Sequence, residues 1–156
     1  MNRLLKTAAP SATSMIRMDH THVMATFHRY RLDASPRTKR GLVETVCLAL
    51  EIHAQLEEEI FYPALREYDK TREIVLEGFE EHHVADLIAA ELKKTDVSDE
   101  RWAAKWSVLK ENLEHHIEEE EEDMFKKART LLDKSELVAL GERMQAVKRQ
   151  VGKEAA

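Results

Sequence analysis

Two stretches of the chain pair a histidine with a glutamate four residues later: His53 with Glu57, and His116 with Glu120. Residues four apart lie on one face of an α-helix, so each pair can direct an imidazole nitrogen and a carboxylate oxygen toward one point. Such pairs also occur on many exposed helices without any site. Imidazole and carboxylate together suit iron, manganese or zinc, and a metal site is therefore the chemistry to test against the rest of the chain.

The pattern occurs twice. A lone histidine precedes each pair, His20 before the first and His82 before the second, and the halves are offset by 62 or 63 residues. Burying six ionisable groups in one layer is costly unless they compensate one another, and bound metal is a natural compensation. Two half-sites indicate two metal ions bridged by the two carboxylates. Each half resembles the two-histidine, one-carboxylate arrangement that leaves positions free for oxygen on non-haem iron, whereas tetrahedral structural zinc would need fewer ligands.

Helices must position these residues. The chain has 156 residues, 43% of them apolar, with only four glycines and three prolines. This composition predicts one all-α domain. Breaks in the pattern predict helices over 14–32, 36–68, 71–94, 99–132 and 135–150. Short connections make the first four antiparallel neighbours, which is an up-down-up-down four-helix bundle with a short additional C-terminal helix.

Local signals set the ends of these helices. Ser35 and Ser98 are predicted N-caps, and Asp133 with Glu136 forms a predicted capping box. Pro63 is expected to kink or loosen the end of the second helix. We expect residues 1–13 to form a flexible N-terminal arm, 14–132 the bundle, and 133–151 a helix packed on it.

The helical period then selects the inward faces, at 100° per residue. The residues placed inward, at similar depth in the bundle, are His20, His53, Glu57, His82, His116 and Glu120. His22 and His115 point away from the apolar stripes and are expected on the surface. Tyr62 also lies off the stripe and is given a structural role, whereas Trp102 and Trp106 are assigned to the core.

Overall charge and cysteine content limit the partners. The net charge of −6 argues against nucleic acid or an anionic membrane as the main partner. No apolar run approaches the roughly 18 residues that would span a bilayer. The single Cys47 excludes an intrachain disulfide and favours the reducing cytoplasm. If the C-terminal helix keeps apolar surface, it offers a contact for a homodimer.

Four stretches in order resemble the hemerythrin-like, HHE cation-binding family. They read MIRMDHTHVMATFHRY, EIHAQLEEEIFYPAL, EEHHVADLIAAEL and LEHHIEEEEEDMF, and together they cover about residues 14–131. The resemblance implies a centre of two non-haem iron ions, in preference to manganese or zinc, with an oxo, hydroxo or water bridge. Its implied ligands are the same six residues that the face and depth arguments select.

One position departs from the oxygen-carrying members, which place a second histidine four residues on in the third helix. Here that position is Asp86. His83 or His28 could replace the missing histidine. Asp86 could itself bind metal, accept a hydrogen bond from a ligand histidine, or face solvent. Reversible oxygen carriage is therefore not assumed.

Three classes of function fit the sequence. The first is a non-enzymatic di-iron protein that binds or senses oxygen, a related small diatomic ligand, or iron. The second is an enzyme acting on peroxide or nitric oxide at the same centre. The third is a metal-free helical interaction module. The sequence shows no separate catalytic base that decides between the first two.

Overall fold

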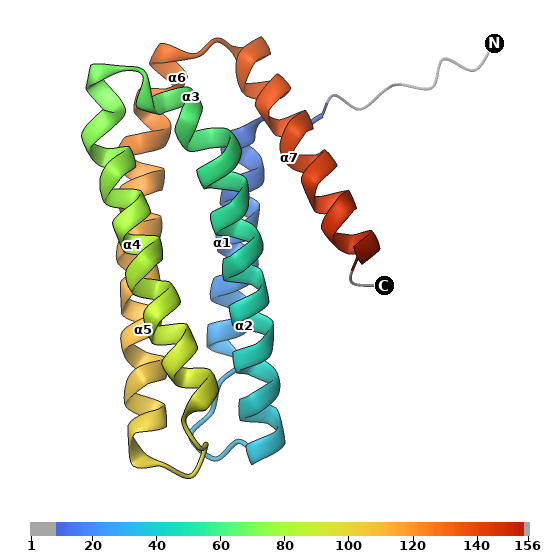
Figure 1. Cartoon of the computed structure of the whole chain (residues 1–156), viewed down its shortest axis with the longest axis vertical. Helices are drawn as coiled ribbons and strands as arrows, with labels where there is room; N and C mark the ends of the chain where they lie inside the picture. The colour runs from blue at the N-terminus through green and yellow to red at the C-terminus, as the bar shows by residue number, and fades with distance from the viewer. Residues whose placement is uncertain (1–8, 155–156) are drawn as a thin grey trace, which may run out of the picture.

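The computed structural model describes residues 9–154 of the chain, all of whose regular elements are helical. The long helices form antiparallel rods, and α7 lies beside α1 and α2 (Figure 1). The elements are α1 (Ala12–His28), α2 (Pro36–Leu56), η1 (Glu57–Phe61), α3 (Tyr62–Arg66), α4 (Asp69–Lys94), α5 (Glu100–Glu119), η2 (Glu120–Met124), α6 (Phe125–Leu131) and α7 (Lys134–Glu154). The predicted four-helix bundle with an added C-terminal helix is confirmed.

Two of the rods contain a π-helical turn. The rod formed by α2, η1 and α3 was predicted as one helix, as was the rod formed by α5, η2 and α6. Each is continuous, but η1 and η2 widen it for five residues. Each π turn begins at one of the two inward glutamates, Glu57 or Glu120. π turns inside α-helices are frequent at functional sites.

Most of the predicted caps are present. Ser35 Oγ accepts the backbone N–H of Thr38 at 3.1 Å. Asp133 and Glu136 form the reciprocal capping box, with both bonds at 2.8 Å. The assignment of Ser98 was wrong, because Asp99 caps α5. The hydroxyl and backbone N–H of Ser98 instead donate to Asp96 in the preceding turn, so its side chain is not available to the helix.

Two apolar clusters fill the bundle, one on each side of the histidine layer. The cluster toward α7 contains Leu56, Phe61 and Phe125 among others. The cluster toward the α1–α2 and α4–α5 loops contains the two tryptophans, which are buried as predicted. The polar layer is thus closed off by hydrocarbon along the bundle axis.

Helix α7 packs on the bundle through Leu137, Leu140 and Met144, which join the first cluster. It extends to Glu154, beyond the predicted end at residue 150, and its 21 residues equal the length of α2. Of the predicted N-terminal arm, residues 1–8 lie outside the described residues, and α1 begins at Ala12. Within residues 9–154, we find no helix whose length and apolarity would allow it to cross a lipid bilayer.

Candidate metal centre

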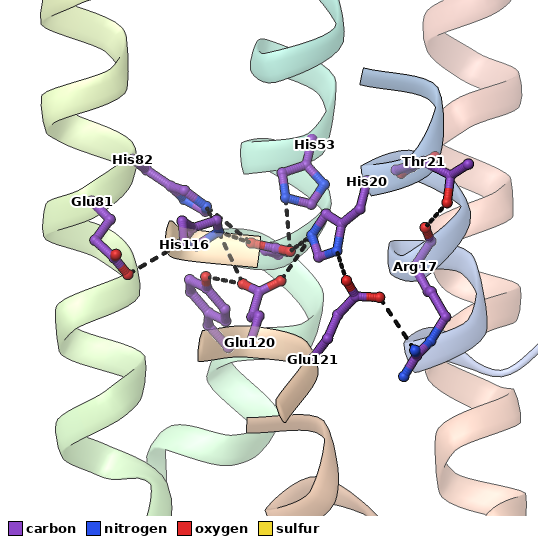
Figure 2. Close-up of polar contacts among 12 residues, drawn as sticks. Arg17, His20, Thr21, His53, Glu81, His82, His116, Glu120 and Glu121 are labelled. Atoms are coloured by element: carbon purple, nitrogen blue, oxygen red, sulfur yellow. Dashed lines mark hydrogen bonds and ion pairs between the residues drawn. The ribbon is translucent and has the colours of Figure 1, made fainter. Parts of the chain in front are cut away.

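The six inward residues meet in one buried layer at mid-height of the bundle. Each of the four rods supplies one histidine, and the two rods with π turns supply the glutamates. All six residues are at most 5% exposed, and Glu57 is completely buried. Figure 2 shows the labelled imidazoles converging on the space around Glu120. The structure therefore brings together the six residues that the face and depth arguments selected.

Glu57 occupies one side of the layer. Its Oε1 lies 2.9 Å from His53 Nε2, and its Oε2 lies 2.9 Å from His82 Nε2. Glu120 is placed in a corresponding way: its Oε1 lies 3.1 Å from His20 Nε2, and its Oε2 lies 3.1 Å from His116 Nε2. Each carboxylate thus lies against imidazoles from two different rods.

These short contacts are not hydrogen bonds. Both oxygens of Glu57, Oε1 of Glu120, and both ring nitrogens of His20 and of His53 are buried without a hydrogen-bond partner. Buried polar atoms are almost always hydrogen-bonded in folded proteins. Nitrogens and oxygens that lie close together but do not align on one another are arranged to share a common ligand. The donor set of neutral imidazoles and carboxylates fits a metal ion.

The buried charges compensate one another in the absence of metal. Burial alone would raise the pKa of Glu57, but the imidazoles of His53, His116 and His82 hold this pKa well below its ordinary value. Burial would lower the pKa of His116, but Glu120, and after it Glu57 and Glu81, raise it well above the ordinary value. Metal must therefore compete with protons for these imidazoles.

A second set of carboxylates contacts the outer nitrogens of three histidines. Glu58 Oε1 lies 3.3 Å from His82 Nδ1, and Glu81 Oε1 lies 3.1 Å from His116 Nδ1. Glu121 Oε2 lies 3.7 Å from His20 Nδ1, and its other oxygen pairs with Arg17 (Figure 2). Such outer partners orient ligand imidazoles and raise their basicity.

Comparison with known proteins agrees with this geometry. The model of the hemerythrin HHE cation-binding domain matches residues 11–128. The chain belongs to the hemerythrin HHE cation-binding family. Its similarity to a crystal structure of an HHE domain-containing protein, the Rv2633c homolog from Mycobacterium kansasii, extends over 92% of this chain and 89% of that one. The TM-score is 0.78 at 23% identity, which supports the shared fold.

Curated relatives of this HHE chain come from mycobacteria. The uncharacterised proteins Rv2633c of Mycobacterium tuberculosis and Mb2666c of Mycobacterium bovis are each 30% identical to it over 106 residues. The match covers 67% of this chain and 64% of either relative, so the chain spans a little under two thirds of their length.

Cation binding by an HHE domain agrees with the way the six side chains group. One atom from each of His53, Glu57, His82 and His116 lies within 4.8 Å of the others, and the same holds for His20, His53, Glu57 and Glu120. The two groups share His53 and Glu57. The layer of this HHE domain therefore offers two adjacent positions for a cation.

The sequence placed Tyr62 off the buried stripe, and that placement is wrong. It is completely buried, and its hydroxyl donates a 2.7 Å hydrogen bond to Glu120 Oε2. Its ring stacks on that of His82, with centroids 5.5 Å apart. Burial, and then the Glu57 and Glu120 carboxylates, raise the pKa of Tyr62 well above its ordinary value, so the hydroxyl stays protonated and donates.

The candidates to replace the missing histidine lie outside the layer. Asp86 and His83 are exposed on α4, and His28 is exposed at the end of α1. The structure therefore matches the solvent-facing alternative for Asp86. His22 and His115 are exposed as expected.

Proposed function

We propose that this HHE protein is a non-haem di-iron protein that binds or senses oxygen, or a related small ligand, at the buried layer. The proposed ligands are His20, His53, Glu57, His82, His116 and Glu120, with the two carboxylates bridging the irons. The observation that carries the proposal is the set of buried nitrogen–oxygen contacts of 2.9–3.1 Å that are not hydrogen bonds. The lone buried thiol of Cys47 is compatible with the proposed cytoplasmic location.

Bound iron would supply redox chemistry toward oxygen or peroxide, and the chain would supply the environment. Two apolar clusters keep bulk water from the layer along the bundle axis. A pocket of about 390 Å³ between α1 and α5 reaches His20 and is lined by Met24, Ile117 and Glu121 among others. This hollow is open to solvent and His20 of the layer is part of its lining, which gives a diatomic molecule or peroxide an approach to the layer from this side.

One observation favours an enzyme that acts on peroxide as the second candidate. The Tyr62 hydroxyl holds a proton beside Glu120 in a buried site. Breaking the oxygen–oxygen bond of peroxide requires a proton, and a positioned hydroxyl is a suitable donor. Under this alternative, the same six residues hold the iron and Tyr62 takes part in turnover.

Metal analysis of the aerobically purified chain tests the proposal. We expect close to two irons per chain and the charge-transfer absorption of a bridged ferric pair. Glu57→Ala should lower the iron content. His22→Ala, which replaces an exposed histidine on the same helix as His20, should leave the iron content unchanged. A folded chain that takes up no iron after anaerobic loading with Fe²⁺ would contradict the proposal.

Peroxide consumption then separates the two candidates. An enzyme should consume peroxide faster than the same concentration of free iron, and Glu57→Ala should abolish this excess. Turnover equal to that of free iron would leave the binding or sensing role.

A further inference from the structure

The two halves of the bundle are related by an internal repeat that extends past the proposed ligands. One half is α1 with the rod α2–η1–α3, and the other is α4 with the rod α5–η2–α6. Each histidine of the layer in the first half, and each of Glu57 and Glu58, has a residue of the same type 62 or 63 positions later. The corresponding pairs are His20 and His82, His53 and His116, Glu57 and Glu120, and Glu58 and Glu121.

The repeat is also visible in the contacts. In the first half, Glu57 and Glu58 contact the two nitrogens of one imidazole, that of His82 from the other half. In the second half, Glu120 and Glu121 contact the two nitrogens of His20 in the same way. Consecutive carboxylates at the start of each π turn therefore hold the lone histidine of the opposite half.

Among the contacts between carboxylates and histidines, the repeat fails at one position. In the second half, Glu81 Oε1 lies 3.1 Å from the outer nitrogen, Nδ1, of His116. The counterpart of Glu81 is Asp19, which directly precedes His20 as Glu81 precedes His82. The counterpart of His116 is His53, whose Nδ1 is buried without a hydrogen-bond partner. The repeat would place the Asp19 carboxylate against His53 Nδ1, but Asp19 makes a different contact.

Asp19 is engaged by helix α7, which has no counterpart in the repeat. The ammonium of Lys148 donates to Asp19 Oδ1. The Asp19 side chain is 13% exposed and that of Lys148 is 35% exposed. Asp19 also lines a groove of about 430 Å³ together with Ala49 and Ile52 of α2. Ile52 is the neighbour of His53, so the carboxylate lies on the side of α1 that faces this part of α2.

We propose that Asp19 is a positioning carboxylate for His53 and that Lys148 of α7 holds it away from that role. Loss of the Lys148 contact lets Asp19 accept a hydrogen bond from His53 Nδ1, as the repeat places Glu81 against His116. An outer carboxylate changes metal affinity about 10- to 100-fold. The docking of α7 therefore sets how firmly His53, which belongs to both cation groups, holds metal. This inference rests on the proposed function.

The rate at which the protein releases iron to an excess of a ferric chelator tests the inference. The loss of visible absorption measures this rate. The proteins compared are the wild type, K148M, and the double variant K148M/D19N. The variant R149M controls for the loss of a positive charge, because Arg149 is exposed and directly follows Lys148 on α7. E81Q shows that the assay detects an outer carboxylate, and should speed release about tenfold or more.

We expect K148M to slow iron release about tenfold or more relative to the wild type. The added Asp19→Asn change should cancel this gain, because an amide is a poorer acceptor than a carboxylate, and R149M should release iron at the wild-type rate. In the zinc-loaded protein, the nitrogen-15 resonance of His53 Nδ1 should move in K148M and return in the double variant.

Two results would overturn the inference. One is equal release from the wild type and K148M while E81Q is faster. The other is a K148M effect that persists in the double variant, since the cause would then be a loosened α7. A wild-type chain that holds no iron in the first place contradicts the proposed function as well, and the iron content measured before the assay separates that case.

Discussion

At the scale of single residues, Tyr62 shows how closely the layer is built. Its hydroxyl fits against α4 only because residue 78 is glycine: a Cβ at Gly78 would lie 2.6 Å from the Tyr62 oxygen. That oxygen in turn fixes Glu120 through a 2.7 Å hydrogen bond. The side chain of one rod thereby sets the orientation of a carboxylate on another.

Tyr62→Phe removes this hydrogen bond without changing the packing of the ring. The variant should fold, because the change leaves the buried ring volume almost intact, and should lose about 1–3 kcal/mol of stability from the unsatisfied carboxylate in the metal-free protein. If peroxide is a substrate, turnover should fall while the iron content stays at the wild-type level. Chemical denaturation with iron removed and peroxide consumption with iron bound measure the two effects. Unchanged peroxide turnover would rule out the hydroxyl as the proton donor.

The six inward residues were predictable from sequence because they obey the helical period up to the π turns. Tyr62 was not, because it follows η1. A π turn contains about one extra residue, which rotates the residues after it by about 100° relative to an uninterrupted α-helix. A side chain expected beside the stripe then points inward. Pro63 indicates an irregular turn near η1. Its counterpart after η2 is Lys126, so no proline indicates the second π turn.

At the scale of elements, α7 was foreseen as a packed helix but not as a close contact of the N-terminal segment. Gly141 makes this contact possible, because a Cβ there would lie 2.1 Å from the backbone oxygen of Pro10. A close approach between two backbone segments produces no periodic pattern in the sequence, so it could not be predicted. The end of α7 was also misplaced, because helix ends without a strong stop signal are set by tertiary packing.

Gly141→Ala should push α7 away from the start of α1. We expect the variant to lose about 1–3 kcal/mol of stability, the usual cost of overpacking, while the bundle still takes up iron. Gly152→Ala is the matched control on the same helix, because nothing lies within 4 Å of its Cβ position. Replacing that exposed helical glycine should stabilise slightly, by up to about 1 kcal/mol. Urea denaturation measures both; equal effects of the two substitutions would contradict a close approach at Gly141.

At the scale of the whole molecule, metal and protons compete for the layer between the two apolar clusters. Without metal, the raised pKa of His116 and of His82 means that their contribution to stability is complete below about pH 6.5, their ordinary value. It is lost as pH rises through the raised values. Glu57 and Glu120 have lowered pKa values, so their contribution is present above about pH 4.5 and is lost as pH falls further. The metal-free bundle should therefore be most stable between these limits.

Above pH 6.5, the stabilisation that iron binding adds should increase with pH, whereas the stability of the metal-free bundle decreases. The imidazoles must be neutral to bind metal, so binding releases protons and strengthens as pH rises. A ligand at a thousand times its Kd stabilises the folded state by about 4 kcal/mol. The Tm of the iron-loaded chain should exceed that of the chelated chain at every pH between 6 and 8, and the gap should widen toward pH 8. Paired thermal melts at several pH values measure the gap. A constant gap would mean that metal and protons do not share the imidazoles of this layer, and that the metal is held by other groups.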